Sequence, residues 1–178
     1  MKKLFTFLMV VAMSTTTAFS QAGSFAIGVG SNMANTSWQD YNLEPTVGYF
    51  MSDNMMVGMG FNFGSSTITN DNGTPDDADD DIDTKTSGLS LSPFFRYYLN
   101  EMFYAHGGIG LTTGSTKVGD ADATTTSSFD LDAGVGLSLM WNEKVAIEPS
   151  LGLAIGSGEN TSSFGIAMGL GINIRLGE

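Results

Sequence analysis

The strictest pattern in the sequence lies near its C-terminus, where large apolar residues alternate with small or polar ones from Phe164 to Leu176. A period of two places successive side chains on opposite faces of a strand, so this segment predicts a β-strand with one apolar face. Its 13 residues exceed the roughly 9–11 that a tilted strand needs to cross a bilayer. What the chain can fold into therefore depends on which environment the apolar face meets.

Seven earlier segments repeat this alternation, which gives eight predicted strands. They span residues 24–32, 41–50, 55–65, 87–99, 102–116, 127–141, 145–157 and 163–176. The connections are of two kinds. Tight turns fall at 51–54, 100–101 and 142–144, and longer polar loops fall at 33–40, 66–86, 117–126 and 158–162. An antiparallel barrel in a membrane has short turns on one side and long loops on the other, whereas a soluble sandwich has no reason to follow that rule.

The two faces of the predicted strands differ in charge. No Asp, Glu, Lys or Arg falls on the bulky apolar face within the strands. The opposite face is mainly Gly, Ala, Ser and Asn, and it carries all the charged positions and the one histidine: Glu44, Arg96, His106, Asp130, Asp132, Glu148 and Arg175. A soluble barrel would instead bury its bulky apolar side chains, and the lumen of eight strands is too narrow for all of them here. The fold class predicted is an all-β, eight-stranded antiparallel up-and-down transmembrane β-barrel.

Three prolines, Pro45, Pro93 and Pro149, fall inside predicted strands on the apolar face. Proline donates no hydrogen bond to a β-ladder and normally lies at an edge or a bulge. A closed barrel has no edges, and the alternation continues on both sides of each proline. We therefore expect local β-bulges at these three positions.

The N-terminus has the layout of a secretory signal peptide. A positively charged start precedes an apolar run at 4–13, and small residues at Ala18 and Ser20 prepare a cleavage site. Together with the loop asymmetry, this predicts the cell outer membrane, with both termini in the periplasm. The expected limits are 1–20 for the signal peptide, with cleavage after Ala22 as the alternative, and 21–178 for the barrel domain.

Composition excludes several classes of function. The formal net charge is −12, and it becomes −14 if Lys2 and Lys3 leave with the signal peptide. Such a chain is a poor ligand for nucleic acid, because binding to phosphates depends on Lys and Arg. The chain has no cysteine, which excludes a disulfide framework and thiolate metal sites.

The segments Leu43-Glu-Pro-Thr-Val-Gly-Tyr-Phe50 and Pro93-Phe-Phe-Arg-Tyr-Tyr98, with the Gly/apolar alternation of the last strand, carry a family resemblance. The chain resembles the small eight-stranded outer-membrane β-barrel proteins of Gram-negative bacteria, such as the transmembrane domain of outer membrane protein A and outer membrane protein X. Members commonly end on an aromatic residue, whereas this chain ends Leu176-Gly-Glu178. The resemblance implies a monomer among outer-membrane lipid and lipopolysaccharide, and no cofactor.

The inward charges predict a buried network near the short turns. We expect Glu148 and Glu44 to neutralise Arg175 and Arg96, with Glu148 opposite a position within about two residues of Arg175. The members of the predicted network are Glu44, Arg96, His106, Glu148 and Arg175. Bulky inward residues gather at this end, so the lumen should be plugged on its periplasmic side. The other end should be an acidic vestibule lined by Asp130 and Asp132.

The loop at 66–86 contains seven aspartates. Carboxylates bind Ca²⁺ and Mg²⁺, so a weak divalent-cation site is one interpretation, but a solvated acidic loop is favoured because the spacing is not that of an EF-hand. The candidate ligands are Asp76, Asp77, Asp79, Asp80, Asp81 and Asp83. No metal centre is predicted elsewhere.

Three functional hypotheses follow. We favour a non-enzymatic outer-membrane barrel with an envelope-structural or surface-interaction role through its extracellular loops. The alternative is a narrow porin-like channel for ions or small solutes. A lipid-modifying enzyme is weaker: His106 could act as a base, but no register argument places an inward serine such as Ser90, Ser92 or Ser138 beside it.

Overall fold

The computed structural model describes residues 22–32, 43–70, 82–158 and 162–176. The strands in these ranges are β1 (Phe25–Asn32), β2 (Glu44–Ser52), β3 (Met55–Asn70), β4 (Ile82–Tyr98), β5 (Phe103–Val118), β6 (Thr124–Leu137), β7 (Leu139–Met140), β8 (Val145–Gly158) and β9 (Ser162–Leu176). Strands adjacent in sequence pair antiparallel, except that β7 follows β6 along the same edge of β8; β1 also pairs with β9, so the sheet closes on itself. Because β6 and β7 are one strand interrupted at Ser138, the predicted eight-stranded barrel is confirmed.

The apolar face points outward. Leu153 is 52% exposed and Ile166 is 62% exposed, whereas the inward carboxylate residue Glu148 is 3% exposed. Large exposed apolar residues occur on every strand that builds the wall. An exterior of this kind is stable only in lipid, where closure of the sheet also satisfies the backbone hydrogen bonds. Within the described residues, no helix is long and apolar enough to span a membrane.

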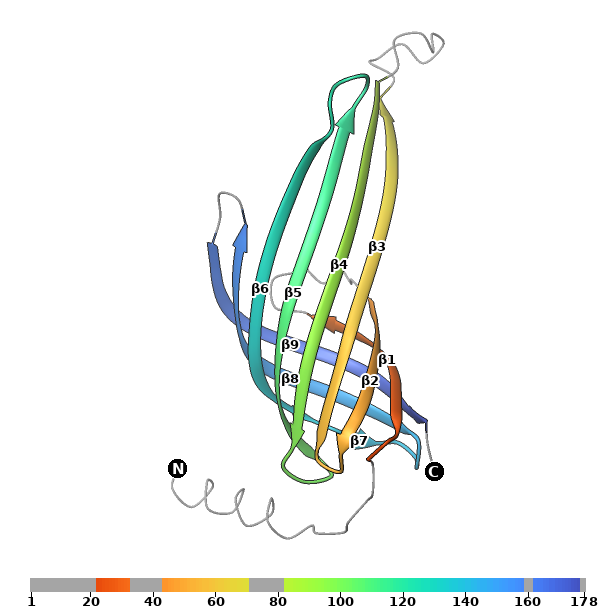
Figure 1. Ribbon diagram of the computed structural model, residues 1–178, viewed down its shortest axis with the longest axis vertical. Helices are drawn as coiled ribbons and strands as arrows, with labels where there is room; N and C mark the ends of the chain where they lie inside the picture. Colours follow the sequence, from red (N-terminus) through yellow and green to blue (C-terminus); the bar gives the residue numbers. More distant parts are fainter. Residues whose placement is uncertain (1–21, 33–42, 71–81, 159–161, 177–178) are drawn as a thin grey trace.

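The two middle hairpins are taller than the rest of the barrel. Figure 1 shows β3, β4, β5 and β6 rising well beyond β1, β2, β8 and β9. The β3–β4 ladder is paired continuously from the short turn to Asn70 and Ile82. The prediction of a loop over 66–86 was therefore wrong at both of its ends. Residues there are polar on both faces, so alternation gives no signal, although Thr and Ile favour strands.

The prolines do not cause bulges. Pro45 and Pro149 are paired in an unshifted register with their neighbours, and the described ladders shift register only at the β2–β3 turn. Pro93 lies where the β4–β5 ladder skips two pairs, and Pro149 lies opposite the β6–β7 interruption. The bulge prediction was wrong, because a missing N–H removes pairing locally without requiring an inserted residue.

The first strand of the barrel begins, and the last strand ends, on the side of the short turns. Phe25, at the start of β1, pairs with Leu176, at the end of β9. The predicted signal peptide, the loop at 33–40 and the C-terminal Gly177-Glu178 lie outside the described residues.

Candidate functional site: the barrel lumen

Aromatic and apolar side chains fill the lumen near the short turns. Phe50, Met56, Tyr98 and Tyr104 come from four successive strands, and all are buried. The ring centroids of Tyr98 lie 5.5 Å from those of both Phe50 and Tyr104. Because inward residues on adjacent strands meet side by side, bulky residues at the same height form a layer across the barrel.

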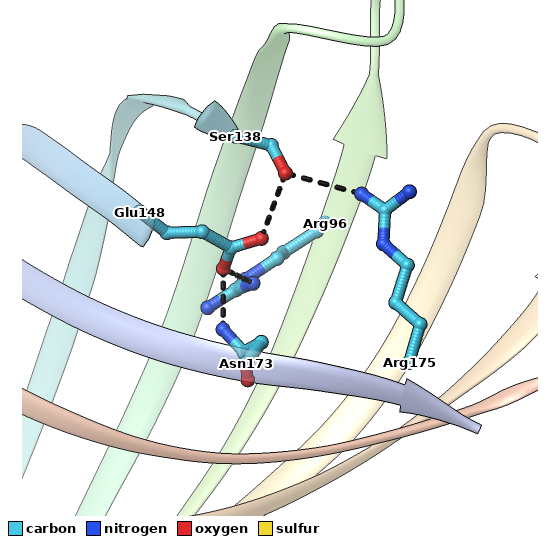
Figure 2. A network of polar contacts seen from close by, with 5 residues as sticks. All are labelled: Arg96, Ser138, Glu148, Asn173 and Arg175. Atoms are coloured by element: carbon cyan, nitrogen blue, oxygen red, sulfur yellow. Dashed lines mark hydrogen bonds and ion pairs between the residues drawn. The ribbon is translucent and has the colours of Figure 1, made fainter. Parts of the chain in front are cut away.

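A buried carboxylate lies beside this layer. Glu148 on β8 forms an ion pair with Arg96, which comes from β4 on the opposite wall (Figure 2). Its other oxygen, Oε1, accepts a hydrogen bond of 3.1 Å from the Ser138 hydroxyl, and the Asn173 amide donates one of 2.5 Å to Oε2. Both oxygens of the buried carboxylate are thus satisfied, as a charge withdrawn from water requires.

The second arginine joins the cluster indirectly. Arg175 Nη2 donates a hydrogen bond of 3.1 Å to Ser138 Oγ (Figure 2). Its guanidinium carbon lies 5.7 Å from the Phe50 ring centroid, while that of Arg96 lies 4.8 Å from the ring of Tyr104. Cation–π contacts at such distances are worth roughly 0.5–2 kcal/mol each, depending on desolvation. We call this cross-section the plug; its members are Phe50, Met56, Arg96, Tyr98, Tyr104, Ser138, Glu148, Asn173 and Arg175.

The structure brings together part of the predicted network. Arg96 lies opposite His106 in the β4–β5 register and pairs with Glu148. Glu148 is paired with Gly171, four residues before Arg175, so the expected register was two residues off. Glu44 forms no ion pair with either arginine among the described residues, and its buried Oε1 lacks a hydrogen-bond partner there.

Two members of the plug escaped the sequence analysis. Ser138 connects Glu148 to Arg175, and Asn173 donates to Glu148. Both are small polar residues on the inward face, like many that line the rest of the lumen. The signal that could have singled out Ser138 is its position between two outward leucines, across the short turn from Glu148, where the ladder is interrupted.

A cavity of about 430 Å³ occupies the lumen on the long-hairpin side of the plug. Arg96, Tyr104 and His106 line it from the plug side. Glu44, Asp130 and Asp132 also line it, among Gly, Ala, Ser and Thr. The predicted vestibule residues therefore face this cavity, and three of its lining residues are carboxylates.

His106 lies at the boundary between plug and cavity. Its Nδ1 is 3.3 Å from Asp132 Oδ1, and its buried Nε2 has no hydrogen-bond partner among the described residues. Ser138 is engaged by Glu148 and Arg175, and Ser90 accepts a hydrogen bond of 3.1 Å from Thr112. Within the described part of the chain, His106 thus contacts an acid through its ring nitrogens but no serine hydroxyl.

The aspartate loop is only partly described. Asp76, Asp77, Asp79, Asp80 and Asp81 lie outside the described residues. Asp83 is in β4, where it accepts a hydrogen bond of 2.8 Å from Thr69 and lies 3.8 Å from Lys85. Within the described ranges, no group of three or more acidic or histidine side chains could hold a metal ion.

Comparisons with known proteins agree with this architecture. The family model described as "Outer membrane protein beta-barrel domain" matches residues 4–152. The structure of Ail, the attachment invasion locus protein of Yersinia pestis, in complex with the heparin analogue sucrose octasulfate, matches with a TM-score of 0.53 and 16% identity, covering 86% of this chain and 97% of that chain. The N-terminal β-barrel domain of Pseudomonas aeruginosa OprF matches with a TM-score of 0.50 and 13% identity, covering 88% and 100%. No curated protein sequence matches the chain.

Proposed function

Because the chain belongs to the outer membrane protein β-barrel domain family, we propose that it is a non-enzymatic, non-transporting barrel that presents two tall hairpins at the cell surface. It is an outer-membrane protein. In the proposal it is a monomer, and the plug separates the cavity from the periplasm. The hairpins β3–β4 and β5–β6 are the surface through which it contacts other molecules.

The observation that carries the proposal is the plug. Glu148 and Tyr104 are 3% and 2% exposed, and Phe50 is fully buried. An eight-stranded lumen is just wide enough to be filled by side chains. A cross-section that combines buried aromatic rings with a satisfied buried ion pair supports a closed barrel.

The proposed orientation follows from the lengths of the connections. Outer-membrane barrels have short periplasmic turns and longer extracellular loops. Since β1 begins and β9 ends at the short-turn end, both chain termini are periplasmic in this proposal. A protease specific for acidic residues, added to intact cells, is expected to cleave within residues 71–81 and to spare Glu101. Cleavage at Glu101 alone would reverse the orientation.

The second candidate is a narrow channel, and the cavity is the observation that favours it. The cavity of about 430 Å³ opens one part of the lumen, and the barrel would conduct if the plug rearranged to open the rest. In the proposal the barrel does not do so, because breaking a buried charge pair typically costs about 3–5 kcal/mol.

Planar-bilayer conductance tests the two candidates. The wild-type protein is expected to show no steady current. The Arg96→Ala/Glu148→Ala variant removes both partners of the ion pair together, and it is expected to introduce conductance. The matched control, Asp130→Ala/Asp132→Ala, changes two charges beside the cavity and should remain silent. Steady ohmic current through the wild type would rule out the closed barrel.

A surface role is supported by the height and composition of the hairpins. Their upper parts are rich in Ser, Thr and Asp and exposed to solvent. The similar Ail protein was solved with a sulfated heparin analogue, and in our proposal the hairpins of this chain also contact extracellular molecules. The expected result of shortening both hairpins to Phe63/Leu89 and Leu111/Phe129 is a folded barrel that has lost adhesion of cells to host matrix. Unchanged adhesion would remove the surface role and leave the structural one.

A further inference from the structure

The chain places its cationic side chains unevenly. Its seven Lys and Arg residues are Lys2, Lys3, Lys85, Arg96, Lys117, Lys144 and Arg175. The first two belong to the predicted signal peptide, both arginines lie in the lumen, and Lys144 lies in a short turn. Lys85 and Lys117 are therefore the only two cations on the long-hairpin side of the barrel among the residues that the structure describes.

These two lysines are direct neighbours. Lys85 on β4 is paired with Lys117 on β5, so the two side chains leave the same face of the sheet. Like charges directly opposite each other destabilise a sheet. An anion between the two ammonium groups would turn that repulsion into attraction.

The neighbouring side chains leave the two ammonium groups available to bind an anion. Lys85 lies 3.8 Å from Asp83, but the two side chains are 62% and 44% exposed, and an exposed pair of this kind is worth little. Lys117 has no ion pair among the described residues, and its side chain is exposed. The local charge of the three residues is one positive unit in a chain whose formal net charge is −12.

The backbone of the pair lies just above the headgroup layer, within reach of a lysine side chain. Lys85 and Leu89 lie on the same outward face, and Leu89 is the last apolar residue of that face before the lysine. Four residues of a strand tilted by about 40° rise about 10 Å. Headgroup layers are roughly 5–8 Å deep, and lysine side chains bend toward such a layer while their stems cover apolar surface. The two ammonium groups therefore reach the level of lipid phosphates.

We propose that Lys85 and Lys117 together bind a phosphate group of lipopolysaccharide in the outer leaflet. The proposal rests on the orientation given above, with the long hairpins outside. A membrane phosphate fits better than a soluble polyanion, because the two lysines lie on the outward face that is in contact with lipid further down the strand. The remaining surface is acidic. Long-range repulsion disfavours an approach of soluble anions from the medium.

The test is a titration of the mature protein, folded in neutral detergent micelles, with diphosphoryl lipid A and with fully dephosphorylated lipid A. The readout is the rise in the thermal unfolding midpoint. Micelles have no sides, so the result does not depend on which side the hairpins face in cells. The variants are Lys85→Gln, Lys117→Gln and the double substitution. Lys144→Gln, which removes a cation at the other end of the barrel, is the matched control.

Diphosphoryl lipid A is expected to raise the midpoint of the wild type and of Lys144→Gln, and dephosphorylated lipid A much less. The concentration for half of the effect should increase about fivefold for each single lysine variant and about 30-fold for the double variant, because each lysine near an anionic surface contributes about 1 kcal/mol. An equal response of the double variant and the wild type would overturn the proposal. An equal rise with soluble sucrose octasulfate would overturn the assignment to a membrane phosphate.

Discussion

Two alanines on one strand summarise how the two halves of the lumen differ. Ala146 and Ala154 both point inward from β8; Ala146 is fully buried in the short-turn half, whereas Ala154 lines the cavity of about 430 Å³. Toward β9 the backbone around them is one continuous ladder. A single barrel thus encloses a packed region and a hollow one, and the difference comes only from the size of the inward side chains.

The glycines repeat this contrast. A Cβ added at Gly136 would collide with the Tyr104 ring, and one at Gly58 would collide with Phe94. At Gly30 and Gly64, on the other side, a Cβ would meet nothing within 4 Å. In the packed half, glycine makes room for a large ring on the next strand; in the open half some glycines face open space, while Gly108 and Gly156 make room for the carboxylates of Asp132 and Asp130.

The largest expected effect is at the buried ion pair. Glu148→Ala leaves Arg96 buried without its partner and should lower the free energy of unfolding by about 3–5 kcal/mol. Asp130→Ala, in the open half, should change it by less than about 0.5 kcal/mol. Reversible urea unfolding in phospholipid bilayers measures both. A double-mutant cycle with Arg96→Ala is expected to show strong coupling to Glu148, and simple additivity would mean that the pair is not formed.

The next effect compares the two faces of β8. Leu151→Arg places a charge in lipid near the middle of the barrel wall and should cost about 2–4 kcal/mol. Ala154→Arg points into the cavity, where its register partner is Asp132, so it should cost less than about 1 kcal/mol. Equal losses in the same unfolding assay would contradict the assignment of the faces.

A smaller effect is expected from adding one methyl group. Gly136→Ala forces the Tyr104 ring to move and should cost about 1–3 kcal/mol, as overpacking typically does. Gly64→Ala meets open space and should be neutral or slightly stabilising, because alanine restricts the unfolded chain. If Gly136→Ala were as mild as Gly64→Ala, the packed half would be looser than described.

The strands and their inward and outward faces could be predicted because they depend on patterns within each strand. The alternation of residues such as Ile147 and Leu151 with small inward residues is a property of each strand alone, so the strands and the faces could be assigned from the sequence. The tall upper ends of β3 and β4 could not be predicted in this way. Both faces of these segments are polar, with residues such as Thr67 and Thr86, and a loop has the same composition.

The partners within the lumen depend on the whole barrel. Arg96 reaches Glu148 across the barrel, and which residues meet there is set by the stagger of all the strands on closure. The register of β8 with β9 is instead set by their own hairpin loop, and there the expected partner of Glu148 was two residues away from the true one, Gly171. Asn173 was not recognised because only the folded barrel distinguishes it from other inward polar residues, whereas Ser138 lies across the short turn from Glu148 and could have been found from that hairpin.

Cysteine accessibility tests most directly whether one half of the lumen is closed and the other open. The chain has no cysteine, so Ala146→Cys and Ala154→Cys each introduce a single thiol on the same face of β8. A small charged thiol reagent added to intact cells is expected to modify Ala154→Cys rapidly. It should leave Ala146→Cys unmodified until the protein is unfolded. Rapid modification of Ala146→Cys in the folded protein would show that water crosses the plug, and it would contradict the account.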